Sequence, residues 1–264
     1  MQTFYQVDAF TDEPFQGNPA SVFVLEKPLS ESMMQNIAME MNLSETAFVC
    51  RDGNEFNLRW FTPVREVPLC GHATLASAKI LFESGVLREN EPAIFNTKSG
   101  KLIAKKNNDF IEMDFPLTTY EKIEINDELQ NAVGENILQA SNTREDVLVE
   151  LESEYNVRNF TPNFNAILNL PYRVMIITAK GKDEYDFVSR FFVPKIGINE
   201  DPVTGSAHCV LSRYWFNKTE KKNFTAYQAS KRGGVVQAEI VDDRVKLLGK
   251  AVVVFKGVLS VTLE

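Results

Sequence analysis

The sequence has few of the residues that build metal centres and disulfide frameworks. Its 264 residues include three cysteines, Cys50, Cys70 and Cys209, and two histidines, His72 and His208. The cysteines form no CxxC pair, so we expect reduced thiols, as in a cytoplasmic protein. With so few histidine and cysteine ligands, a zinc site built from these residues is not expected.

Long apolar runs and an excess of positive charge are also missing. The apolar stretches, such as residues 251–255, fall far short of a membrane span, and the first residues lack the basic and apolar parts of a secretory signal. The formal net charge of -8 repels phosphate backbones and anionic membranes. The sequence therefore predicts a cytoplasmic protein that binds neither nucleic acid nor membrane.

The chain contains an internal repeat. Residues 59–63 (RWFTP) correspond to residues 190–194 (RFFVP) at an offset of 131. A few residues later, Gly71 and Gly205 each open an apolar segment at an offset of 134, and this offset then persists for about 40 residues. A common register across separate segments predicts a duplicated, two-domain architecture.

The elements within the repeat suggest how each domain is built. Residues 72–84 and 206–217 are apolar on most faces of a helix, which predicts two buried helices. Residues 110–114 and 235–241 alternate as strands do, and residues 31–41 carry one apolar helical face. We therefore predict an α+β fold of two pseudo-symmetric domains, each a curved, mainly antiparallel sheet wrapped around a central helix.

The domain boundary is predicted near residue 117. Residues 117–165 are polar and charged with weak periodicity, and we interpret their first part as the connection. The domains would then cover residues 1–117 and 118–264. Alternatively, the last strand, at about residues 257–264, joins the first domain.

The beginnings of the two buried helices are candidate binding sites. The first N–H groups of a helix lack partners within it, and the helix dipole makes this end positive. Two such ends facing the domain junction could bind a carboxylate. The alternative is that Gly71 and Gly205 only permit close packing. Ser206 is a good N-cap for the second helix and needs no other function.

Three polar side chains are candidates for proton transfer. Glu45 follows a helix and precedes an apolar strand, where partial desolvation would suit it to shuttle a proton; the alternative is a carboxylate that caps a turn. His72 begins a helix, where the dipole favours the neutral imidazole, and it could contact a ligand or be purely structural. Asp201 lies in the loop before the second helix, where it could also act as a cap.

The thiol of Cys70 is a further candidate, because it lies near a helix N-terminus. Its partner in the repeat is Thr204, so the chain lacks the two opposed thiols that would swap protons across a substrate. A single thiol could still act alone.

Six segments in order resemble the phenazine-biosynthesis PhzF-like family across essentially the whole chain. They include the sequences around Asn18, Glu45, Arg59, His72 and Asp201, and they are residues 8–20, 43–48, 58–63, 69–74, 200–208 and 228–234.

The resemblance implies a fold like that of diaminopimelate epimerase and a homodimer. It also implies a cofactor-independent isomerase acting on a small carboxylic acid, similar to the isomerase of trans-2,3-dihydro-3-hydroxyanthranilate. The family's proton-shuttling glutamate corresponds to Glu45, and its other catalytic positions correspond to His72 and Asp201. Its substrate-binding positions correspond to Ser206, Gly71, Ala73, Thr204, Gly205 and Asn18.

The sequence also departs from the patterns it resembles. Thr204 stands where epimerase relatives carry a second cysteine, and Pro68 stands where the phenazine enzyme is expected to have an acidic residue. Two alternatives therefore remain beside the isomerase. One is an epimerase or racemase that uses the single thiol of Cys70. The other is a small-acid binding protein without catalysis.

Overall fold

The computed structural model describes residues 2–143 and 145–261. Its described residues form two compact units. The first unit takes the chain up to residue 114 and again from residue 248, and the second unit is residues 115–247. No helix within the described residues combines the length and apolar character needed to cross a membrane.

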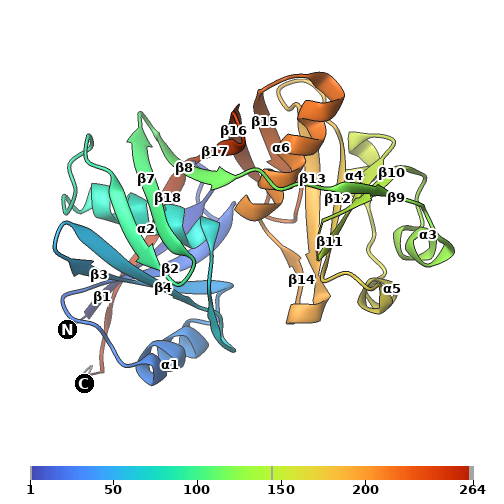
Figure 1. Cartoon of the computed structure of the whole chain (residues 1–264). Coiled ribbons are helices and arrows are strands. Elements are labelled where there is room, and N and C mark those ends of the chain that lie inside the picture. Colours follow the sequence, from blue (N-terminus) through green and yellow to red (C-terminus); the bar gives the residue numbers. More distant parts are fainter. Residues whose placement is uncertain (1, 144, 262–264) are drawn as a thin grey trace. The chain divides into compact units, whose positions relative to one another are not determined.

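The first unit is a mixed sheet with two helices (Figure 1). The strands lie side by side in the order β18-β1-β2-β3-β4-β6-β7-β8, and the β2–β3 and β4–β6 pairs are parallel while the others are antiparallel. The elements are β1 (Gln2–Ala9), β2 (Asn18–Leu25), α1 (Glu31–Met41), β3 (Glu45–Asp52), β4 (Glu55–Phe61), β5 (Glu66–Val67), α2 (Gly71–Glu83), β6 (Ala93–Thr97), β7 (Gly100–Asn107), β8 (Phe110–Pro116) and β18 (Ala251–Leu259).

Helix α2 lies inside this sheet. It contacts β1, β2, β3, β7 and β18, and most of its residues are buried (Figure 1). Small side chains such as Ala73, Ala76 and Ala78 are fully buried and let the surrounding strands approach the helix. The strands therefore curve around α2, as the apolar sequence of this helix predicts.

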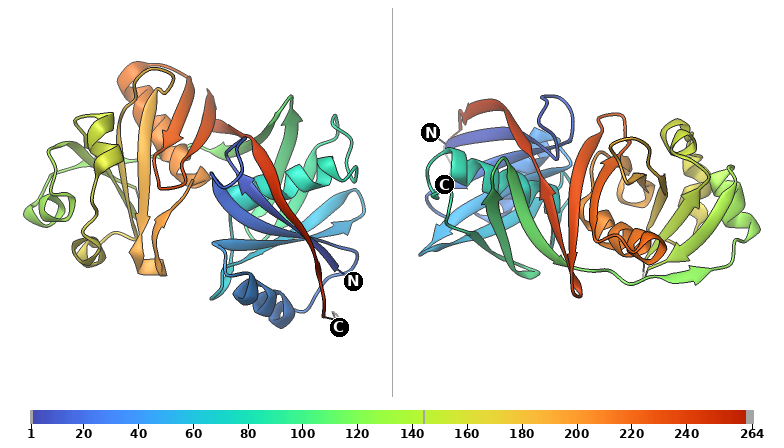
Figure 2. Two further views of the ribbon diagram at one scale, coloured as in Figure 1. Left: turned by 180° about the vertical axis from the view of Figure 1, so that it is seen from behind. Right: turned by 90° about the horizontal axis from the view of Figure 1, so that it is seen from above.

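Helix α1 lies on the other side of the sheet, against β3 and β4 (Figure 2). Met34, Ile37 and Ala38 form its buried face, and the Ser30 hydroxyl caps its first turn by accepting from the Met33 N–H. Its bounds and apolar face confirm the helix predicted over residues 31–41.

The second unit has the same plan. Its sheet order is β9-β10-β11-β12-β13-β15-β16, and the β11–β12 and β13–β15 pairs are parallel. The elements are β9 (Glu121–Ile123), α3 (Asp127–Val133), β10 (Ile137–Asn142), β11 (Asp146–Leu151), α4 (Glu154–Asn159), α5 (Phe164–Asn169), β12 (Val174–Lys180), β13 (Phe187–Val193), η1 (Pro194–Ile196), β14 (Ile198–Asp201), α6 (Gly205–Thr219), β15 (Asn223–Gln228), β16 (Gly234–Val241) and β17 (Arg244–Gly249).

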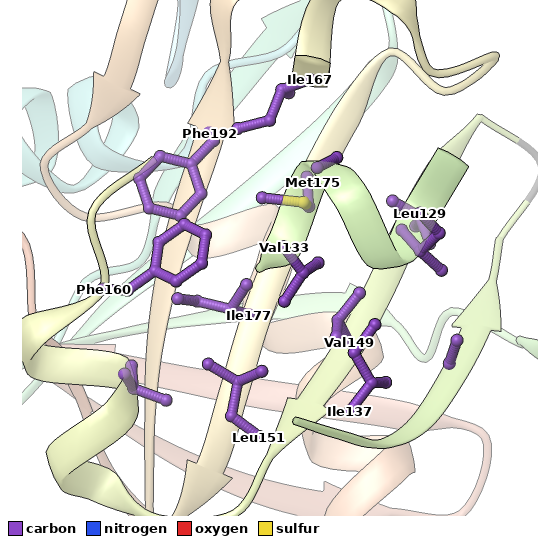
Figure 3. Packing of buried hydrophobic residues seen from close by; sticks show 14 of the residues in the cluster. Leu129, Val133, Ile137, Val149, Leu151, Phe160, Ile167, Met175, Ile177 and Phe192 are labelled. Atoms are coloured by element: carbon purple, nitrogen blue, oxygen red, sulfur yellow. The ribbon is translucent and has the colours of Figure 1, made fainter. Parts of the chain in front are cut away.

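The two faces of the second sheet bury different helices. Figure 3 shows one face, where Val149, Leu151 and Ile177 pack against side chains of α3 and α5. On the other face, Thr178 accepts a hydrogen bond of 3.1 Å from the Trp215 indole of α6. Each sheet thus has a central helix on one face and one or more shorter helices on the other, which confirms the predicted α+β class.

Matching ion pairs mark the repeat in both units. Arg59 of β4 binds both carboxylate oxygens of Glu66 at 2.7 and 2.6 Å. Arg190 of β13 binds both oxygens of Glu200 at 2.7 and 2.9 Å. Each guanidinium also lies over a phenylalanine two residues later, at 5.2 and 4.9 Å. The sequence offset predicted the matching strands, but not these pairs.

Some predictions at finer scale were wrong. Ser206 is not an N-cap, because α6 already begins at Gly205 after Thr204, and Ser206 is an exposed residue of the first helical turn. Beyond their first part, residues 117–165 contain β9, α3, β10, β11 and α4, which the sequence did not indicate. Weak periodicity hid β11, whose residues are buried on both faces rather than alternating.

Candidate active site

Strand and helix ends in the first unit bring together the side chains of Asn18, Glu45 and His72. Asn18 begins β2 and Glu45 begins β3, and these strands are parallel with Ala20 beside Glu45. The two strand starts therefore lie at the same end of the sheet, where α2 also begins. Asn18 is fully buried, His72 is 5% exposed, and the Glu45 side chain keeps 17% of its surface accessible.

His72 is at the centre of this group. Its Nδ1 lies 3.2 Å from the Asn18 amide nitrogen, and its Nε2 lies 3.3 Å from Glu45 Oε2. Although the second distance is short, Nε2 lacks the alignment of a hydrogen bond. A buried polar nitrogen without a hydrogen bond is costly, so this atom is a natural contact for a ligand that enters beside Glu45.

The His72 ring is neutral near pH 7, because burial lowers its pKa to about 3. Its contact with Glu45 is therefore not an ion pair at that pH. The Asn18 amide nitrogen can only donate, so Nδ1 accepts and the ring proton is on Nε2. This tautomer places an N–H donor next to the Glu45 carboxylate.

Cys70 contacts the same ring. It is buried and immediately precedes α2, and its Sγ lies 3.5 Å from His72 Nδ1. The structure therefore brings the thiol together with Glu45 and His72, two of the three predicted proton-transfer residues.

The two central helices differ from the others at their first turn. In α1, α3, α4 and α5, a serine or asparagine side chain accepts from a backbone N–H of the first turn. The residues before α2 and α6, Cys70 and Thr204, make no such cap. The first N–H groups of these two helices, at Gly71 to Ala73 and at Gly205 to Ala207, suit an anionic ligand.

The remaining predicted residues form a second group, within the second unit. Asp201 ends β14, and its Oδ2 accepts a hydrogen bond from the Thr204 hydroxyl. Gln228, at the end of β15, accepts from the Thr204 N–H at 2.8 Å and donates to the Asp201 carbonyl at 2.8 Å. The loop between β14 and α6 is thus held in shape, with Ser206 exposed just after it.

Sequence reasoning missed the role of Gln228. It is fully buried, although glutamine is usually exposed, and its amide satisfies three groups of the loop before α6. It lies in one of the segments that carried the family resemblance, but no local pattern indicates which strand-end glutamine turns inward.

His208 has a structural role in α6. Its Nδ1 donates to the Thr204 carbonyl at 2.8 Å, and its ring packs against Phe187. Burial is the main cause that lowers its pKa to about 4, so it is neutral near pH 7.

Acid is expected to destabilise the protein through His208. In the unfolded chain His208 is protonated below about pH 6.5, whereas in the folded chain it stays neutral down to about pH 4. The free energy of unfolding therefore falls as the pH is lowered across this window. Relative to a His208→Gln variant, the wild type should lose about 2 kcal/mol between pH 6.5 and 4.5. Urea unfolding at several pH values measures this, and parallel curves for the two proteins would contradict it.

The chain is similar to known proteins in both sequence and structure. A family model described as "Phenazine biosynthesis-like protein" matches residues 7–257. An uncharacterized isomerase from Halalkalibacterium halodurans is 48% identical, over 97% of this chain and 97% of its own. A PhzF-family phenazine biosynthesis protein from Enterococcus faecalis has a TM-score of 0.94 at 46% identity, covering 97% of this chain and 98% of that chain. A "Predicted Epimerase" from Pseudomonas aeruginosa shares the fold, with a TM-score of 0.75 at 19% identity over 99% of this chain and 100% of that chain.

Proposed function

This chain belongs to the family of phenazine biosynthesis-like proteins, as its sequence motifs predicted, and from that premise we propose that it is an isomerase in which Glu45 transfers a proton. The substrate is a small unsaturated carboxylic acid similar to trans-2,3-dihydro-3-hydroxyanthranilate. The reaction needs neither a metal nor an organic cofactor.

The proposed reaction moves one proton and one double bond. Glu45 removes a proton from a substrate carbon, and the electrons of the broken C–H bond form a new C=C bond. The electrons of the former C=C bond then take the proton from Glu45 at another carbon. Reactant and product have the same atoms, and Glu45 returns to its carboxylate form.

The observation that carries the proposal is the placement of Glu45 beside the buried, neutral His72. The Nε2–H of His72 has no hydrogen bond within the chain and lies next to Glu45, so it can donate to the substrate where the proton moves. The N–H groups of Gly71 and Ala73, in the uncapped first turn of α2, would bind the substrate carboxylate.

Asp201, Thr204, Gly205 and Ser206 remain predicted site residues of the second unit. Their loop is held by Gln228, which supports a binding role because a fixed loop loses little entropy when a ligand binds. We propose that the first turn of α6, like that of α2, is a binding site for an anionic group.

A second candidate is an epimerase that uses Cys70, favoured by the 3.5 Å contact between its Sγ and the His72 ring. A thiol beside an imidazole can become a thiolate that exchanges protons with carbon. Thr204 at the matching position of α6 weighs against a two-thiol mechanism.

Turnover measured by NMR tests the proposal. Purified protein should convert trans-2,3-dihydro-3-hydroxyanthranilate, or another acid from a panel of small unsaturated carboxylic acids, to an isomer. A Cys70→Ala variant that keeps this activity would favour Glu45, and one that loses it would favour the thiol. Stoichiometric binding without conversion of any acid would instead indicate a binding protein.

A further inference from the structure

The side chains around His72 also form a donor set for a metal ion. One donor atom from each of Glu45, Cys70 and His72 lies within 4.8 Å of the others. Thiolate sulfur, imidazole nitrogen and carboxylate oxygen are the ligands that zinc takes in proteins. We propose that this group binds Zn²⁺ reversibly and that the bound ion inhibits the isomerase. The inhibition rests on the proposed function, whereas the binding does not.

The donors lie within 4.8 Å of one another, somewhat farther apart than the ligands of a tetrahedral ion. Ligand atoms about 2.0–2.3 Å from zinc lie about 3.3–3.6 Å apart along the edges of a tetrahedron. Cys70 Sγ lies 3.5 Å from one nitrogen of the His72 ring, and Glu45 Oε2 lies 3.3 Å from the other. Because one ion uses only one ring nitrogen, the three donors must draw together by about 1 Å on binding.

The choice of ring nitrogen follows from the hydrogen bonds. Nε2 has no hydrogen bond and belongs to a ring that is more than nine-tenths buried, so it is the donor without a competing partner in the chain. When Nε2 binds the ion, the ring proton moves to Nδ1. The Asn18 amide can then reverse and accept from Nδ1–H, which is the support that zinc-bound histidines usually have.

The charges of the three ligands balance the charge of a bound zinc ion. Zinc binding breaks the Cys70 S–H bond, forms a Zn–S bond and releases one proton to solvent. The thiolate and the Glu45 carboxylate together cancel the two positive charges, and the neutral ring adds none. A neutral complex costs little desolvation in this buried place. The fourth position stays open for water, while Glu45 can no longer accept a proton from a substrate.

Cobalt provides the direct test, because Co²⁺ takes zinc sites and absorbs visible light. Chelator-treated, reduced protein titrated with Co²⁺ should show a thiolate-to-cobalt charge-transfer band and strong visible bands, saturating at one ion per chain. Added Zn²⁺ should abolish both. The Cys70→Ser variant should lose the charge-transfer band, whereas Cys209→Ser, which removes a buried thiol of the second unit, should keep it.

Either of two results would overturn the site. One is the absence of a charge-transfer band in the wild type, and the other is a band of equal strength in Cys70→Ser. Activity is a separate readout: one Zn²⁺ per chain should abolish turnover and a chelator should restore it, and full activity of the zinc-loaded protein would refute the inhibition. If the metal-free protein turns over no acid, the proposed function fails, and the cobalt spectrum still decides whether the site exists.

Discussion

Replacement of Glu45 by glutamine is expected to lower kcat of the isomerase by about 10²–10⁴-fold. Glutamine has nearly the same shape but cannot accept and return a proton, so the chemical step should slow while substrate binding, measured as KM, changes little. Steady-state kinetics on the substrate identified by NMR measure both values.

Two further variants make this result specific to proton transfer. Glu45→Asp keeps a carboxylate but withdraws it from the reacting carbon, so its rate should lie between those of the wild type and Glu45→Gln. Glu55 also begins a strand, but it pairs with Lys101 at the surface. The Glu55→Gln variant should therefore be as active as the wild type. A Glu45→Gln enzyme with wild-type kcat would remove Glu45 from the mechanism.

Removal of the Arg190 side chain is expected to cause a large loss of stability, of about 3–5 kcal/mol for Arg190→Met. The Arg190 side chain is 11% exposed, and its guanidinium binds both oxygens of Glu200 and donates to the Phe160 carbonyl at 2.6 Å. Without it, Glu200 would be left as a mostly buried charge, and the carbonyl would lose a donor. Urea unfolding of the variant measures the loss.

The matching arginine of the first unit is the control. Arg59 is more exposed, at 31%, and its partner Glu66 also binds Lys98. Because Lys98 would still neutralise Glu66, Arg59→Met should cost only about 1–3 kcal/mol. Equal losses for the two variants would show that the second cation does not compensate.

The repeat could be predicted from the sequence because the two units pack in the same way. The corresponding strands and helices therefore need similar residues at matching positions. Arg59 and Arg190 occupy the same place on β4 and β13, and Gly71 and Gly205 both begin a central helix. Each central helix is surrounded by strands, so it carries apolar residues on most faces, and that pattern is visible without a structure.

The features that the sequence did not predict mostly depend on contacts between residues that are distant in the chain. The Asn18 amide contacts the His72 ring, which is 54 residues later in the sequence, and Gln228 binds Thr204, which is 24 residues earlier. No periodicity records such pairs. Strand β11 was missed because both of its faces are buried, which removes the alternation that identifies a strand.

The candidate site was only partly predictable for a similar reason. A lone glutamate before an apolar strand is more often a cap than a base, and the family resemblance singled out Glu45. The neutral state of His72 was expected from its place at a helix start, but the cause of its lowered pKa is burial, which depends on the folded sheet around it. The contact between Cys70 and His72 was not anticipated.

Proton exchange in D₂O tests the central claim most directly. The wild type should incorporate deuterium from solvent into the substrate or its isomer, at the carbons between which the proton moves, because the proton held by Glu45 can exchange with water. Glu45→Gln should incorporate none above the uncatalysed rate. If the variant exchanges the same carbon positions as fast as the wild type, another group is the base and the account of Glu45 is wrong.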